Sequence, residues 1–366
     1  MKYSSAENEY LIELLKCAIV GTDLPEVPVG LDYSALIKNS KNQQVYSVIS
    51  EVLDAKNLPA EQAKSLENYV KGELFRTISM KSEFELLEKE LADNKIKFMP
   101  LKGSVLRSFY PKQKMRQMSD VDILYDYSKR DILLKIMKSH GYRMTASCEN
   151  SDDFFREPFF TFEWHRELFF EEADFCPHFD LWKNAKQDKE NPYKYHIEST
   201  EHFVYTICHM YKHYATNGCG VRFLCDIFVM LHNGTPVDIK KADARFKEIG
   251  IEDFANDAIA LANAVFLDGD ISENQQKMLD FMLSDGVYGN MIVDYTKKFS
   301  EFGGSKFKYI FRRIFPEKKK MFADYRQLEK RPFLLPLYYI IRLFTKMKYN
   351  SKAAKYELES IKKIDK

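Results

Sequence analysis

Strand-like patterning occurs in only one stretch of this 366-residue chain, residues 94–172, and this limits its fold more than any other feature. Before that stretch apolar residues recur at helical spacing, and from about residue 175 onward the spacing is helical again. Within it, short segments alternate apolar and polar residues, as half-buried strands do. These patterns predict an α+β fold with one small mixed β-sheet. The predicted divisions are an N-terminal helical region (1–93), an α/β core (94–172), a C-terminal helical bundle (173–305) and a basic helical tail (306–366).

Periodicity and helix-ending residues predict the individual elements. Gly103 is expected to open a short helix that Pro111 ends, and Gly141 to end the helix before a strand that begins near Tyr142. The sequence shows no sign of a second sheet. The other strands are predicted at 96–100, 119–125 and 160–165, and the other helices at 5–19, 43–56, 60–93, 175–186, 199–216, 221–233, 237–249, 251–267 and 273–284.

Composition excludes several classes of protein. The chain is 45% hydrophobic and has no low-complexity segment, which excludes a disordered scaffold. Its six cysteines form no CxxC pair, so buried free thiols are favoured over a zinc site at Cys219 and Cys225. The N-terminal segment carries charges within its apolar part and has no cleavage-site pattern, unlike a signal peptide. We therefore expect a cytoplasmic protein.

Charge is distributed unevenly along the chain. The formal net charge of +1 argues against a dedicated nucleic-acid binder, yet residues 306–366 hold 18 Lys and Arg against 6 Asp and Glu, a local charge of +12. The longest apolar run in this tail, residues 334–344, contains Pro336 and Arg342 and is too short to cross a bilayer. We expect a helix packed on the bundle with its lysines solvated. Peripheral contact with anionic lipid, or docking of an acidic acceptor, is the alternative.

Two aspartates in the segment SDVDILY are the first candidates for chemistry. Asp120 and Asp122 alternate with Val121 and Ile123, so on a strand both carboxylates would point to one side, where they could share a divalent metal. The competing interpretation is a solvated edge strand whose other face is buried. Aspartate is disfavoured in strands, however, and two of them between apolar residues suggest a cost tolerated for function.

The segment before these aspartates predicts a turn that can approach a phosphate. Lys102, Gly103 and Ser104 lie where a strand passes into a helix, and glycine lets the backbone come close to a ligand. An ordinary tight turn is the alternative when this tripeptide is taken alone. The turn and the aspartates support each other, because a metal-bound nucleotide needs both carboxylates and a place for its phosphates.

Together, the strings LKGSVLRSFYP and RQMSDVDILY resemble the uncharacterised bacterial nucleotidyltransferase family of the DNA polymerase beta-type superfamily. That family shows Lys-Gly, Tyr-Pro and then Arg-x-x-x-Asp-hydrophobic-Asp, and Arg116 stands at the arginine position. The likeness extends over roughly residues 95–345. One departure is the separation of Ser104 from Asp120, which exceeds the usual spacing in the superfamily because of the Tyr110–Pro111 stretch.

The resemblance also implies a third carboxylate on a later strand. Glu163 and Asp180 are the two candidates, and Glu163 is preferred because it shares the polar face of a strand with His165. Asp180 is expected to help cap a following helix. The implied metal ligands for Mg²⁺ or Mn²⁺ are therefore Asp120, Asp122 and Glu163.

The string EHFVYTICHMYKHYATNGCGVRFLCDIFVML resembles the helical part of the same family. His209 and His213 stand one helical turn apart, a spacing that can bind zinc, but hydrogen-bonded packing histidines are favoured because no third ligand is evident. Lys212 and Arg222 are cations that could meet phosphate oxygens. Arg222 and Asp226 could equally form a structural ion pair. The substrate-binding candidates are His165, Lys212, His213, Arg222 and Asp226.

These residues lead to a metal-dependent nucleotidyltransferase as the functional hypothesis. It would move a nucleoside monophosphate from a nucleoside triphosphate to an acceptor hydroxyl and release pyrophosphate, with two metal ions on the carboxylates. Gly103 and Ser104 would hold the terminal phosphates, with Lys102 or Arg116 countering charge, unless Lys102 is a structural partner under the turn. The acceptor stays open among small molecules, sugars, proteins and RNA. The alternatives are a catalytically inactive nucleotide-binding or interaction protein with the same fold, and a phosphoesterase.

Overall fold

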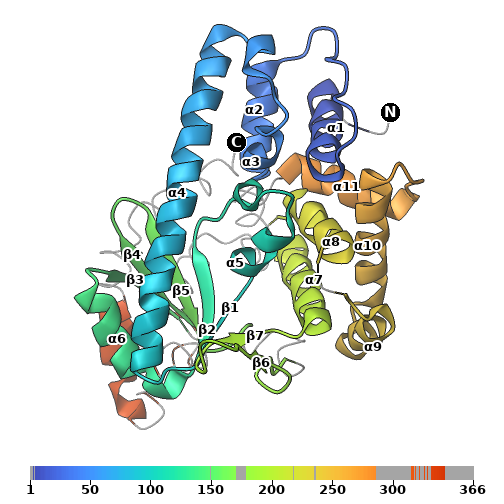
Figure 1. Ribbon diagram of the computed structural model, residues 1–366. Coiled ribbons are helices and arrows are strands. Elements are labelled where there is room, and N and C mark those ends of the chain that lie inside the picture. Colours follow the sequence, from blue (N-terminus) through green and yellow to red (C-terminus); the bar gives the residue numbers. More distant parts are fainter. Residues whose placement is uncertain are drawn as a thin grey trace.

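A five-stranded mixed β-sheet forms the centre of the computed structural model (Figure 1). The structure describes Tyr3, residues 5–148, 150–169, 179–216, 218–234 and 236–285, and isolated positions and short segments between residues 315 and 342. The strand order is β1–β2–β5–β4–β3, with β2 and β5 parallel and all other neighbours antiparallel. The predicted α+β class is confirmed. The strands are β1 (Phe98–Pro100), β2 (Val121–Tyr125), β3 (Arg143–Ser147), β4 (Ser151–Arg156) and β5 (Phe160–His165).

One face of the sheet is covered by two helices. The long helix α4 (Ala60–Asp93) runs beside the sheet toward α6 (Arg130–Ser139) in Figure 1. Alternation along β2 and β5 directs Ile123, Phe162 and Trp164 into the apolar cluster that these helices close, and all three are fully buried. The predicted apolar face of β5 is thereby confirmed for Phe162 and Trp164. Asp122 and Glu163 lie on the opposite face of these strands and line the cavity described below.

Most of the remaining chain is helical. The helices α1 (Ala6–Val20), α2 (Tyr33–Asn42) and α3 (Tyr46–Ile49) share one apolar cluster with the C-terminal helices. Side chains cap two of them, since Ser5 accepts from the backbone of Asn8 and Asp32 from that of Ser34. The C-terminal helices are α7 (Ser199–Thr216), α8 (Arg222–His232), α9 (Ile239–Ile249), α10 (Glu252–Phe266) and α11 (Glu273–Asp285).

Several predicted elements were wrong. The helix expected at 43–56 is replaced by the short helix α3 and a single 3₁₀ turn at Ala55–Asn57, and α2 was missed. Residues 179–186 of the helix expected at 175–186 form turns and the start of a strand. A second sheet does exist, a two-stranded one of β6 (Lys186–Gln187) and β7 (Tyr195–His196). These strands are too short to show a period in the sequence.

Two expectations concern regions that the structure covers only in part. The end of the predicted helical bundle (286–305) lies outside the described residues, and so does most of the predicted basic tail (306–366). Among the described residues, no helix combines the length and apolar character that a membrane-spanning segment needs. Cys208, Cys219 and Cys225 are buried free thiols, as predicted, whereas Cys17 and Cys148 are free thiols that are only partly buried.

Candidate functional site

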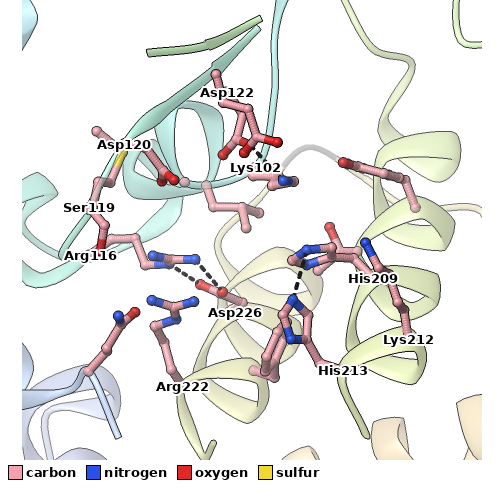
Figure 2. Close-up of a pocket in the computed structure, with 18 residues that line it drawn as sticks. Lys102, Arg116, Ser119, Asp120, Asp122, His209, Lys212, His213, Arg222 and Asp226 are labelled. Carbon is pink, nitrogen blue, oxygen red and sulfur yellow. Dashed lines mark hydrogen bonds and ion pairs between the residues drawn. The ribbon is translucent and has the colours of Figure 1, made fainter. Parts of the chain in front are cut away.

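A cavity of about 280 Å³ separates the open side of the sheet from helices α7 and α8 (Figure 2). The turn before α5 (Gly103–Leu106) and strands β2 and β5 form one wall, and the two helices form the other. All predicted site residues line it except Ser104 and His165. Those that do are Lys102, Gly103, Arg116, Asp120, Asp122, Glu163, Lys212, His213, Arg222 and Asp226. Of the two residues that do not line it, Ser104 is hydrogen-bonded to the backbone of Leu101 and His165 is buried.

The sheet register places two carboxylates side by side. Asp122 on β2 is the direct neighbour of Glu163 on β5, because the two strands are parallel and paired in that register. Asp120 immediately precedes β2, so it is not a strand residue as predicted, but its side chain also points toward the cavity (Figure 2). The interpretation of these aspartates as a solvated edge strand was wrong. The strand β2 lies between β1 and β5, and Asp122 is only 6% exposed.

Asp122 is held by two cationic or hydrogen-bonding partners. Its Oδ1 accepts a hydrogen bond from Lys102 Nζ at 2.6 Å and lies 2.9 Å from His165 Nε2. His165 Nε2 is also 3.5 Å from Glu163 Oε1. One potential ligand atom from each of Asp122, Glu163 and His165 lies within 4.8 Å of the others, and this is the single such cluster of three among the described residues. His165, which does not line the cavity itself, is thus placed to orient the Asp122 carboxylate through its Nε2.

The carboxylates of this wall carry more negative charge than Lys102 neutralises. Burial and the charge of Asp122 raise the pKa of Asp120 to about 6. Burial also acts to raise the pKa of Asp122, but the Lys102 ammonium and His165 hold it well below its usual range. Asp122 is therefore ionised at neutral pH, and the nearby Asp120 is penalised for ionising.

A divalent cation fits this donor set. The carboxylates of Asp122 and Glu163 are hard oxygen donors, and His165 adds an imidazole nitrogen that Mn²⁺ accepts. Asp120, also predicted as a carboxylate ligand, lies outside this cluster of three but lines the same cavity. The mutual repulsion of Asp120 and Asp122 is the kind that a bound cation relieves. The residues present therefore match the needs of a metal site.

The turn at Gly103 brings backbone to the cavity surface. Lys102 has φ 47° and ψ −126°, a conformation that residues with a side chain rarely adopt, and it places Gly103 at the start of α5. A Cβ at Gly103 would lie 3.0 Å from Met118 Cγ, so a side chain there would crowd the wall. Ser104 does not line the cavity, because its hydroxyl donates to the Leu101 carbonyl at 2.5 Å.

The helical wall carries the predicted cations and a pair of histidines. His213 Nε2 lies 3.2 Å from His209 Nε2, and Figure 2 shows the two rings together beside Lys212. Burial and the charge of Lys212 lower the pKa of His213 to about 4, and burial and the Lys102 charge lower that of His209 well below its usual range. Both imidazoles are therefore neutral at neutral pH. This arrangement agrees with hydrogen-bonded histidines, and no third zinc ligand joins them among the described residues.

Arg116 and Asp226 join the two walls. Arg116 Nε lies 2.7 Å from Asp226 Oδ1 and Nη2 lies 2.9 Å from Oδ2, a bidentate pair, while Nη1 donates to the Gln117 carbonyl. Tyr110 donates its hydroxyl to the same aspartate at 2.7 Å. Asp226 is only 1% exposed. Much of the Arg116 charge is thus committed within the protein.

Sequence reasoning missed several residues of the site. Tyr205 and Thr206 line the cavity from α7, and their spacing from His209 and His213 was the signal that could have found them. Asp153 on β4 is the neighbour of Glu163 across the sheet, and burial and the Glu163 charge raise its pKa to about 6. It was missed because β4 was missed. Asp180, the rival third carboxylate, accepts from the Trp182 backbone in an exposed turn and does not cap a helix.

A small mixed sheet with flanking helices and a carboxylate-lined cavity is consistent with a nucleotidyltransferase core. The profile of the family described as uncharacterised nucleotidyltransferase matches residues 30–267, which contain both walls of the cavity. The match covers well over half of the chain, and the chain belongs to this family. It supports nucleotidyl transfer as the general chemistry and a nucleotide as the substrate class. No curated protein and no solved structure gives a significant match.

Proposed function

We propose that this protein uses a divalent metal to move a nucleoside monophosphate from a nucleoside triphosphate to an acceptor hydroxyl, with release of pyrophosphate. The observation that carries the proposal is the division of one cavity into two walls of opposite charge. Asp120, Asp122 and Glu163 line the sheet side, and Lys212 and Arg222 line the helical side. A metal-bound triphosphate carries both kinds of charge, and such a cavity complements it.

The sheet wall would hold the metal. Asp120, Asp122 and Glu163 are the proposed ligands, and His165 keeps the Asp122 carboxylate in position through its Nε2. When bound, Mg²⁺ or Mn²⁺ supplies charge neutralisation and alignment of the reacting groups. Asp122 and Glu163 need little movement, since the parallel register of β2 and β5 already places them side by side.

The opposite wall and the turn would hold the phosphates. Lys212 and Arg222 supply positive charge from α7 and α8, and the backbone of the Gly103 turn can approach a phosphate closely because it has no Cβ. His209 and His213 are neutral, so they offer hydrogen bonds without adding charge. They are suited to position the acceptor hydroxyl.

The size of the cavity limits what it can enclose. About 280 Å³ lies just below the usual range for small-molecule sites, about 300–1,000 Å³. We propose that it encloses the phosphates and the reacting hydroxyl, while other parts of the nucleotide or the acceptor extend outside. This leaves small molecules, proteins and RNA ends open as acceptors.

The test is transfer of label from a nucleoside triphosphate radiolabelled at the α-phosphate, with Mg²⁺ or Mn²⁺ and cell extract as the source of acceptor. Wild type is expected to label an acceptor, whereas Asp122→Asn and Glu163→Gln should lose at least about 100-fold of the rate. Asp180→Asn is the matched control, because Asp180 is an exposed carboxylate outside the cavity. Circular dichroism confirms that each variant is folded. Equal labelling by wild type and Asp122→Asn would overturn the proposal.

A second candidate is a nucleotide-binding protein without transfer activity. The ion pair of Lys102 with Asp122 favours it, because an internal cation already contacts one proposed ligand. In that case wild type binds nucleotide, Asp122→Asn binds it equally well, and no acceptor is labelled under any metal condition.

A further inference from the structure

Lys102 occupies the position of a counter-ion inside the acidic wall. Its Nζ lies 2.6 Å from Asp122 Oδ1, and the two side chains are 20% and 7% exposed. The charges of Asp122 and Glu163 both act on the ammonium, as does the hydroxyl of Tyr205. In this state Asp122 Oδ1 already accepts a hydrogen bond from a cation of the protein itself.

A metal ion and this ammonium would compete for the same oxygen. A divalent ion binds carboxylate oxygens at about 2.0–2.2 Å, so at Asp122 it would lie within a few ångströms of Lys102 Nζ. Two positive centres that close repel each other strongly in a buried site. Metal binding at Asp122 Oδ1 therefore requires the ammonium to move away, and a metal on Oδ2 of the same carboxylate is still repelled by it at close range.

The cavity offers the ammonium one destination once a nucleotide is present. Lys102 lines the same cavity as Lys212 and Arg222, and its flexible four-carbon side chain can turn from Asp122 toward the open space. A phosphate placed over the Gly103 turn would lie next to it, because Gly103 follows Lys102 directly. The ammonium can then exchange a carboxylate partner for a phosphate partner.

We propose that Lys102 is an exchangeable counter-ion that makes metal binding depend on nucleotide binding. This inference rests on the proposed function. Without nucleotide, Lys102 neutralises Asp122 and weakens metal binding. With nucleotide, it contacts the phosphate and leaves Asp122 to the metal. If Lys102 had a purely structural role under the turn, its replacement would instead weaken the binding of both the metal and the nucleotide.

The test uses the full chain and two binding measurements. Mn²⁺ affinity without nucleotide is measured by electron paramagnetic resonance of the free ion, and nucleotide affinity without metal is measured by calorimetry with a non-hydrolysable α,β-methylene triphosphate. For Lys102→Met we expect Mn²⁺ to bind about tenfold more tightly, a typical size for coupling between two sites, and nucleotide to bind more weakly. Opposite directions of the two changes, with a gain in Mn²⁺ affinity larger than that of a lysine variant on the other wall, identify an exchangeable counter-ion.

Lys212→Met is the matched control. It removes a lysine from the opposite wall and leaves the ion pair of Lys102 with Asp122 in place. We expect weaker nucleotide binding and a much smaller gain in Mn²⁺ affinity than for Lys102→Met. Equal gains in the two variants would overturn the proposal, because they would reflect the net charge of the cavity alone.

Other outcomes separate this inference from the proposed function. If Lys102→Met does not fold, Lys102→Gln replaces it, since glutamine removes the charge and keeps a donor for Asp122. Unchanged or weaker Mn²⁺ binding in the folded variant, together with metal-dependent transfer by wild type, refutes the counter-ion and leaves the proposed function standing. Tighter Mn²⁺ binding in the variant without any transfer by wild type supports the counter-ion and contradicts the transferase.

Discussion

Replacement of Asp226 by asparagine tests whether one buried ion pair holds the two walls of the cavity together. Asp226 accepts three short hydrogen bonds, two from Arg116 at 2.7 and 2.9 Å and one from Tyr110 at 2.7 Å. Asparagine keeps the size of the side chain but removes its charge and offers only one acceptor oxygen. The side-chain NH₂ group would then face a guanidinium nitrogen, with two donors in contact and no acceptor between them.

The expected loss follows from the burial of both partners. The side chains of Arg116 and Asp226 are 7% and 1% exposed, so water cannot replace the lost bonds. Removing one member of a buried ion pair costs about 3–5 kcal/mol, since it leaves a buried charge without compensation. Tyr110→Phe removes one hydrogen bond and keeps the pair, and about 1.5–3 kcal/mol is expected for a bond to a charged group. Arg116→Met combined with Asp226→Leu should cost less than Asp226→Asn, because no isolated charge remains.

Urea unfolding measures these losses with two probes. Circular dichroism follows the helices, and tryptophan fluorescence in a Trp182→Phe background follows the sheet, where Trp164 is fully buried. The midpoint should fall with little change in slope, as expected when stability alone changes. A loss below about 1 kcal/mol for Asp226→Asn would refute the reasoning, since it would mean that the pair is not the buried, mutually dependent contact described here.

Two further predictions concern pH and the turn. Burial lowers the pKa of His202 to about 4, so the unfolded chain takes up the proton first, and the contribution of His202 to stability should fall by at most about 3 kcal/mol as pH decreases from about 6.5 to 4. His209 and His213, whose pKa values are also lowered, act in the same direction. His202→Gln should flatten this decline in urea midpoints measured across that range, and an unchanged slope would contradict the assignment. Gly103→Ala should press on Met118, lower stability by about 1 kcal/mol and weaken nucleotide binding in calorimetry. Unaltered nucleotide affinity would show that the turn does not approach the phosphates.

The long periodic helices could be predicted from the sequence, and the missed elements have physical explanations. The strand β4 contains Asp152 and Asp153, and acidic residues are disfavoured in strands. Asp152 is nevertheless fully buried, because Arg130 pairs with it at 2.7 Å and Ser147 donates to it. Arg130 is 22 residues away in the chain, so no local pattern could reveal this compensation.

Most residues of the cavity were predictable from the turn, the helical cations and the family resemblance, but the placing of the carboxylates was predictable only where it depends on alternation along a strand. That Glu163 and Phe162 point in opposite directions follows from the period of two, and the structure agrees. That Asp122 lies beside Glu163 depends on a parallel register between strands 41 residues apart, which the sequence does not show. The contact of Lys102 with Asp122 also depends on a positive φ at a residue other than glycine, an uncommon conformation that sequence patterns do not predict.

The segment between strands β1 and β2 explains why the spacing from Ser104 to Asp120 is long. Leu106, Tyr110 and Met115 belong to the apolar cluster of the helical bundle, whereas the sheet residues behind the site belong to a separate cluster. This segment therefore packs into the bundle while both its ends are fixed in the sheet. Together with the pair of Arg116 and Asp226, it sets the distance between the acidic and the cationic wall. A shorter connection from the turn to Asp120 could not reach the bundle, and the two walls would lose the contacts of Leu106, Tyr110 and Met115 with it.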